Sequence, residues 1–146
     1  MGTPRTKRKN RLRHEAEAEA RLGPDPLRLA AEFGTDPLPV MRRLALRPGS
    51  RFGLVICDGS GTLTFRKPAE GFAIPRFGAA CPLWPLYTAL GRPSQPVQAV
   101  VATAGRLSRR FRIRAWCSPT HPAGFNGPEL RTAAMLIQPL AANDGS

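Results

Sequence analysis

The stretch Arg110-Phe-Arg-Ile-Arg-Ala-Trp-Cys117 decides the fold, because apolar and polar side chains alternate along it with a period of two. That period is typical of a β-strand with two different faces. The apolar face comprises Phe111, Ile113, Ala115 and Cys117, and the other face comprises Arg110, Arg112, Arg114 and Trp116. Apolar, β-branched residues 97–103 and residues 132–138 predict two further strands around it.

Upstream of these strands the pattern predicts a hairpin, preceded by two helices. Residues 52–67 alternate on both sides of the turn Asp58-Gly-Ser-Gly61, which indicates a β-hairpin. Asp25-Pro26 and Asp36-Pro37 each combine an N-cap with a proline at the first helical position, and Gly34 ends the first helix. Residues 83–90, opened by Pro82 and ended by Gly91, predict a short apolar helix.

The predicted fold class is therefore α+β: an amino-terminal helix pair, a β-hairpin, then a mostly antiparallel sheet with one covering helix. Four segments are expected along the chain. Residues 1–23 form a basic flexible tail, because six lysines and arginines between residues 5 and 13 repel one another with no acid among them. Residues 24–70 hold the helix pair and hairpin, residues 71–140 form the carboxy-terminal domain, and residues 141–146 are a tail.

Composition and charge limit the classes of function. No apolar run approaches the about 20 residues of a membrane span, and no apolar signal region follows the basic amino terminus, so a cytoplasmic protein is expected. The net charge of +12 favours an acidic partner or nucleic acid. The 3 cysteines are too few and too scattered for a disulfide framework.

Two stretches carry a resemblance to a known family. Gly71-Phe-Ala-Ile-Pro-Arg-Phe-Gly78, followed by Cys81-Pro-Leu-Trp84, resembles a signature of the short-chain fatty acyl transcriptional regulators. The loop Pro122-Ala-Gly-Phe-Asn-Gly-Pro128 and the run Ala134-Met-Leu-Ile137 are similar to the same carboxy-terminal domain. The likeness covers about residues 25 to 140.

That resemblance implies a bacterial regulator with an XRE-type helix-turn-helix, a central ImmA/IrrE-like region and a carboxy-terminal domain that senses short-chain acyl-CoA. Residues 24–70 would then be the end of the ImmA/IrrE-like region, and residues 71–140 the effector-sensing domain. The chain departs from the family pattern, because it lacks the DNA-binding domain, the HExxH peptidase motif and a cysteine-rich end. A shortened paralogue or a reading frame begun at an internal start is therefore expected.

The candidate ligand site is the polar face of the deciding strand. Arg110, Arg112 and Arg114 would lie side by side and suit phosphates, and Trp116 could stack on an adenine ring. A solvated outer face is the alternative for these residues. The signature residues Cys81, Pro82, Leu83 and Trp84 are expected to be structural, opening a helix whose Trp84 packs in the core.

The helix pair has two interpretations. As a helix-turn-helix it would direct Arg42, Arg43 and Arg47 toward DNA phosphates; as an ordinary packing pair it would border another domain.

No enzyme is expected, since only His14 and His121 could act as bases for Cys81, and no metal site or cofactor is predicted. The predicted function is the ligand-sensing portion of a bacterial transcription regulator, with acyl-CoA or another acidic effector as partner. The alternative is a small stand-alone basic protein that binds DNA or other nucleic acid.

Overall fold

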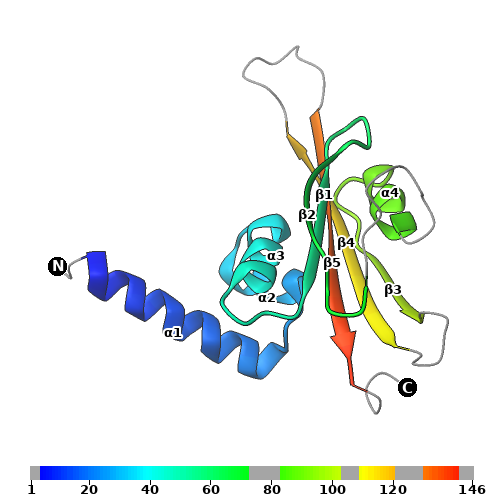
Figure 1. Cartoon of the computed structure of the whole chain (residues 1–146). Helices are drawn as coiled ribbons and strands as arrows, with labels where there is room; N and C mark the ends of the chain where they lie inside the picture. The colour runs from blue at the N-terminus through cyan, green and yellow to red at the C-terminus, as the bar shows by residue number, and fades with distance from the viewer. Residues whose placement is uncertain (1–3, 73–82, 103–108, 121–129, 142–146) are drawn as a thin grey trace.

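The computed structural model describes residues 4–72, 83–102, 109–120 and 130–141. It is a mixed α+β fold in which the helices come first, as the sequence predicts (Figure 1). The helices are α1 (Pro4–Leu22), α2 (Pro26–Phe33), α3 (Pro37–Leu46) and α4 (Trp84–Leu90). The strands are β1 (Gly53–Cys57), β2 (Leu63–Lys67), β3 (Val97–Ala102), β4 (Arg110–Thr120) and β5 (Leu130–Leu140).

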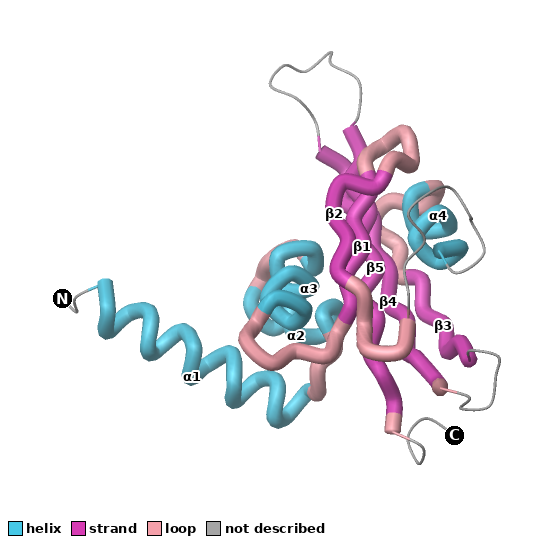
Figure 2. The backbone as a smooth tube through the Cα atoms, viewed as in Figure 1, coloured by secondary structure: helices cyan, strands magenta, loops and turns pink. Residues whose placement is uncertain are grey.

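The strands form one antiparallel sheet in the order β2-β1-β5-β4-β3 (Figure 2). The last strand, β5, therefore lies in the middle of the sheet and joins the hairpin β1–β2 to the pair β3–β4. Its register pairs Met135 with Val55 on one side and with Ala115 on the other. β1, and β5 over residues Ala133–Ile137, have paired strands on both edges, so these segments lie in the interior of the sheet.

Helices cover both faces of the sheet, so the protein has three layers (Figure 1). On one face, α4 packs on the predicted apolar side of β4, where Phe111, Ile113 and Cys117 are fully buried. On the other face, α2 and α3 pack on the alternate residues of β1 and β5, such as Leu54 and Leu136. Every residue of β1 is buried for this reason. The sequence predicts one covering helix, and this helix is α4. The helix pair α2–α3 covers the other face of the sheet.

The helix pair begins and ends as the sequence indicates. The carboxylate of Asp25 accepts hydrogen bonds from the backbone N–H groups of Leu27 and Arg28, at 3.0 and 3.4 Å. The Asp36 carboxylate accepts one from Leu38 at 2.9 Å. Gly34 ends α2 in the left-handed conformation, with φ of 63°.

The expectation of a flexible tail over residues 1–23 is wrong for residues 4–22, which form α1. Figure 1 shows its amino-terminal half pointing away from the sheet, while its last turns approach the helix pair. Ala18 is 3% exposed there, Glu15 forms an ion pair with Arg43 of α3, and Glu19 forms one with Arg47, directly after α3. The ion pairs of Glu15 and Glu19, which follow the basic run, therefore hold the last turns of α1 near α3.

A half-buried network joins the hairpin to α3 and to the residues that follow it. The Lys67 ammonium at the end of β2 donates to the backbone carbonyls of Ala45, Ser50 and Phe52, at 2.6, 3.1 and 2.7 Å. In the described part of the chain, no helix is both long enough and apolar enough to cross a bilayer.

Candidate functional site

The three arginines of β4 lie on the helix-pair side of the sheet, but they differ in burial. Arg110 and Arg112 are half-buried, whereas Arg114 is only 8% exposed. Pro24 and Asp25, directly before α2, contact Arg114. The expected uniform ladder of exposed guanidiniums is therefore wrong at Arg114.

Arg114 joins the sheet to the start of α2. Its Nη1 donates to Gln138 Oε1 at 3.0 Å and to the Pro24 carbonyl at 3.4 Å. Its Nε lies 3.8 Å from Asp25 Oδ2, the carboxylate that caps α2. Among the described residues, no acceptor lies within hydrogen-bond distance of this buried Nε. The Nε of Arg114 is therefore a buried donor that makes an ion pair with Asp25 but no hydrogen bond within the described part of the chain.

The local charge is strongly positive. Burial lowers the pKa of Arg114, the nearby Asp25 carboxylate opposes that effect, and the charges of Arg112 and Arg28 lower the pKa further. Two guanidiniums, those of Arg28 and Arg114, lie 3.9 and 3.8 Å from the Asp25 carboxylate, which already accepts two backbone hydrogen bonds, and the charge of Arg112 acts on Arg114. An additional anion would be stabilised at this place.

We call the uncovered part of this face the open corner; it comprises Gln98, Val100, Arg110, Arg112 and Gln138. The β-register places Val100, Arg112 and Gln138 in one row across three strands. Gln98 and Val100 of the edge strand β3 are exposed, and Val100 retains 47% of its surface. The open corner contains cationic, amide and apolar side chains, and it contains no carboxylate.

Trp116 packs toward the helix pair. It is half-buried against the helix-pair core, and its Nε1 donates to Ser118 Oγ at 3.1 Å. Ser118 Oγ in turn donates to the Asp36 carboxylate, at 2.7 Å to its nearer oxygen. These hydrogen bonds join Trp116 on β4 to the start of α3 and give this side chain a structural role.

The arginines of the helix-turn-helix interpretation all have intramolecular partners. Arg43 is paired with Glu15, and Arg47 is paired with Glu19 at 2.6 Å. The hydrogen bond from Glu19 raises the pKa of Arg47. The Arg42 guanidinium lies over the Phe65 ring, 5.8 Å from its centroid. These contacts support the alternative of a packing pair.

The signature residues are placed only in part, because Cys81 and Pro82 lie outside the described residues. Leu83 is buried on the sheet, as expected. Trp84 is 46% exposed, so its assignment to the core is wrong. Leu83 and Leu86 occupy the buried stripe of α4 at a spacing of three, and Trp84 lies off that stripe. His121 and the loop up to Pro128 also lie outside the described part.

The described residues contain no group of three or more side chains that could hold a metal ion. Cys57 and Cys117 are buried free thiols. Burial raises the pKa of the Cys57 thiol to about 11, so it is protonated at neutral pH.

A groove between α1 and α3 was missed by sequence reasoning. Its volume is about 820 Å³, and its lining includes Leu12, Phe33 and Leu46. These side chains are 52%, 41% and 48% exposed. They belong to three separate helices, so only the packing of α1 against the helix pair brings them together.

Comparisons with known proteins identify the class. The fold matches that of a Mycobacterium tuberculosis transcriptional regulator with a TM-score of 0.65 and 28% sequence identity, over 86% of this chain and 39% of that one. A propionyl-CoA carboxylase regulator of Cereibacter sphaeroides is 38% identical over an alignment of 127 residues that covers 84% of this chain and 27% of the relative. Both are named as regulators, so this chain has the fold of a regulator's domain.

The family follows from the match to residues 45–141, which fit the carboxy-terminal domain described as short-chain fatty acyl coenzyme A regulator. The chain belongs to this family, which confirms the resemblance seen in the sequence. The match contains all five strands and α4, and therefore the open corner. The chain spans about a quarter of the length of its curated relative.

Proposed function

We propose that this chain is the effector-sensing domain of a bacterial transcription regulator, and that a short-chain acyl-CoA binds at the open corner. The observation that carries the proposal is the excess of guanidinium over carboxylate around Arg112 and Arg114, on a part of the sheet that none of the described helices covers. Coenzyme A is rich in phosphate, and charge-assisted contacts from arginine to phosphate are the strong ones.

The side chains in and beside the open corner would contribute to ligand binding in different ways. Arg112 contacts a phosphate directly from the open face, and Arg28 adds positive charge from the first turn of α2. Gln138 offers an amide for hydrogen bonding, although its Oε1 already accepts from Arg114. The exposed Val100 gives the ligand an apolar contact beside the charges.

Binding at this place also suggests how an effector signals. Arg114 holds Asp25, and Asp25 caps α2. A phosphate near Arg114 competes with Asp25 for the same guanidinium and weakens the hold of the sheet on the helix pair. The helix pair then carries the signal to whatever it contacts in a longer protein.

Nucleic-acid binding is the second candidate, and the observation that favours it is the run of six basic residues between positions 5 and 13, at the projecting end of α1. Such binding depends on counterion release, so its affinity falls steeply with salt and shows little preference for sequence. Effector binding is saturable and selective for the ligand.

The test titrates the protein with propionyl-CoA and with a duplex DNA of random sequence, each at low and high salt. Saturable binding of the acyl-CoA, with weak and salt-sensitive DNA binding, supports the sensor. Tight DNA binding with no acyl-CoA binding at either salt would reject the sensor in favour of the nucleic-acid protein.

A further inference from the structure

The groove between α1 and α3 has an apolar lining that the fold leaves uncovered. Its exposed apolar side chains come from all three amino-terminal helices: Leu12, Phe33 and Leu46. Leu29, Val40 and Leu44 also line the groove, but they are buried. Ala18 is the only fully buried residue in the described part of α1, so most of this helix is held away from the pair. Exposed apolar surface of this kind costs free energy in water, and it commonly marks a binding surface.

The rim of the groove is cationic. Four arginines line it, Arg11, Arg42, Arg43 and Arg47, against two acids, Glu15 and Glu19. Glu15 accepts from Arg43 and lies 4.0 Å from Arg11, so this rim already binds a carboxylate. Arg42 forms no ion pair with a carboxylate in the described part of the chain, and its guanidinium stacks on Phe65.

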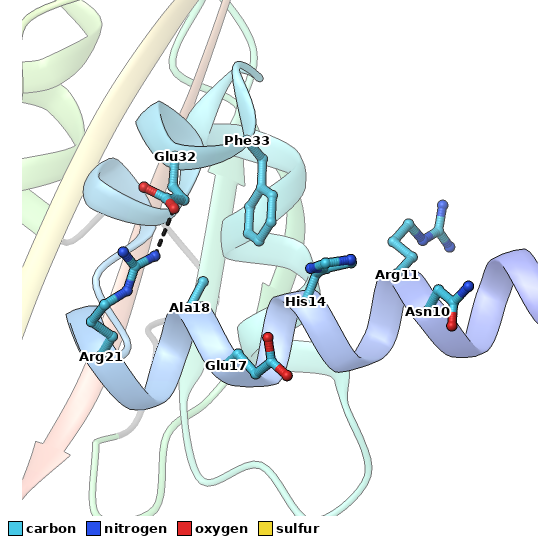
Figure 3. Close-up of a pocket in the computed structure, with 8 residues that line it drawn as sticks. All are labelled: Asn10, Arg11, His14, Glu17, Ala18, Arg21, Glu32 and Phe33. Atoms are coloured by element: carbon cyan, nitrogen blue, oxygen red, sulfur yellow. Dashed lines mark hydrogen bonds and ion pairs between the residues drawn. The ribbon is translucent and has the colours of Figure 1, made fainter.

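A second hollow lies on the other side of α1, and it has a different character. Its volume is about 640 Å³, and it is lined by Glu17, Arg21, Glu32 and His14, among others. Figure 3 shows Phe33 pointing from the end of α2 toward α1, with Arg21 bound to Glu32 beside it. Most of the residues that line this hollow are polar or charged, and its Arg21 is already paired with Glu32, so the groove is the better site for an alkyl chain.

We propose that the groove between α1 and α3 binds an anionic amphiphile, a molecule with an alkyl chain and one acidic head group. The apolar lining takes the chain, and the arginine rim takes the head in competition with Glu15. The volume of about 820 Å³ lies within the range of about 300–1,000 Å³ found for small-molecule sites. The positive rim selects against a cationic head group.

This site is independent of the proposed function, because its lining residues lie within residues 11–47 and share none with the open corner. The family match begins only at residue 45, so the groove lies almost entirely outside the matched domain.

The experiment measures binding of dodecanoate by calorimetry, below its micelle concentration, with dodecyltrimethylammonium as the cationic counterpart. Leu46→Glu places a negative charge in the groove at a side chain that is 48% exposed, so folding is preserved. Leu130→Glu is the matched control, at a side chain that is 53% exposed at the start of β5. Circular dichroism checks that each variant is folded.

The expected result is one saturable site for dodecanoate and none for the cation. Leu46→Glu weakens binding by about tenfold or more, while Leu130→Glu and Arg112→Gln leave it unchanged. Glu15→Gln tightens binding, because Arg43 is then available to the head group. A folded wild type that does not bind dodecanoate overturns the proposal, as does equal binding of both amphiphiles or equal loss in the control. A dimer in sedimentation that Leu46→Glu dissociates would assign the groove to a second copy of the chain and also overturn it.

Discussion

Replacing Arg114 by methionine should destabilise the protein, whereas the same change at Arg112 should not. Arg114 is 8% exposed and binds Gln138 at 3.0 Å, while Arg112 stands half-buried on the open corner. Methionine keeps much of the volume and removes the charge in both variants. The comparison therefore isolates the contribution of the buried Arg114 guanidinium to the free energy of unfolding.

The magnitude follows from the contacts that are lost. A hydrogen bond to a charged group contributes about 1.5–3 kcal/mol, and Arg114→Met loses one good bond, one weak bond and an ion pair at 3.8 Å. Relief of the desolvation of the guanidinium offsets part of this. Asp25 keeps its two backbone hydrogen bonds, so no unpaired buried charge remains. We expect a net loss of about 1.5 kcal/mol, against about 0.5 kcal/mol or less for Arg112→Met.

Urea unfolding followed by circular dichroism measures the free energy of unfolding of both variants, and thermal unfolding measures their Tm. With an unfolding entropy of about 2.1 cal/mol/K per residue over 146 residues, 1.5 kcal/mol corresponds to a fall in Tm of about 5 °C. Equal stability of the two variants would refute the argument, because it would mean that Arg114 is solvated like its neighbour.

Three further outcomes are expected. Lys67→Met leaves three backbone carbonyls without their donor and should cost about 2 kcal/mol in the same urea assay; a loss below about 0.5 kcal/mol would contradict the network. Trp84→Ala should cost about 1 kcal/mol, since the side chain is 46% exposed; a loss in the range of about 3–5 kcal/mol expected of a buried tryptophan would return it to the core. The Cys57 thiol, whose pKa burial raises to about 11, stays protonated at pH 8, so iodoacetamide followed by peptide mass spectrometry should label it only in urea; fast labelling of the native protein would argue against burial.

Much of the fold could be predicted because local patterns specify it. The period of two in β4 identifies the buried face that contains Phe111 and Ile113, and the Asp-Pro pairs locate the starts of α2 and α3. These signals depend only on residues close together in the chain. They therefore predict the same helices and strands for any order of the strands in the sheet.

The candidate site was harder to predict, because it depends on contacts between distant residues. The period of two shows that Arg114 and Ile113 lie on opposite faces of the sheet. It does not reveal that α2 packs on the face that carries Arg114. The ion pairs that hold α1 join residues 28 apart, Glu15 to Arg43 and Glu19 to Arg47. Trp84 is different: the spacing of Leu83 and Leu86 already places it off the buried stripe of α4, and this local signal could have been used.

The most direct test of the account is the dissociation constant for propionyl-CoA of the wild type, Arg112→Gln and Arg92→Gln. Arg92 is an exposed arginine after α4, outside the open corner, so it controls for the loss of one positive charge. We expect Arg112→Gln to weaken propionyl-CoA binding by about tenfold or more. Arg92→Gln should change the dissociation constant by less than about twofold, and both variants should be fully folded. Equal dissociation constants for the wild type and Arg112→Gln would contradict the open corner as the effector site.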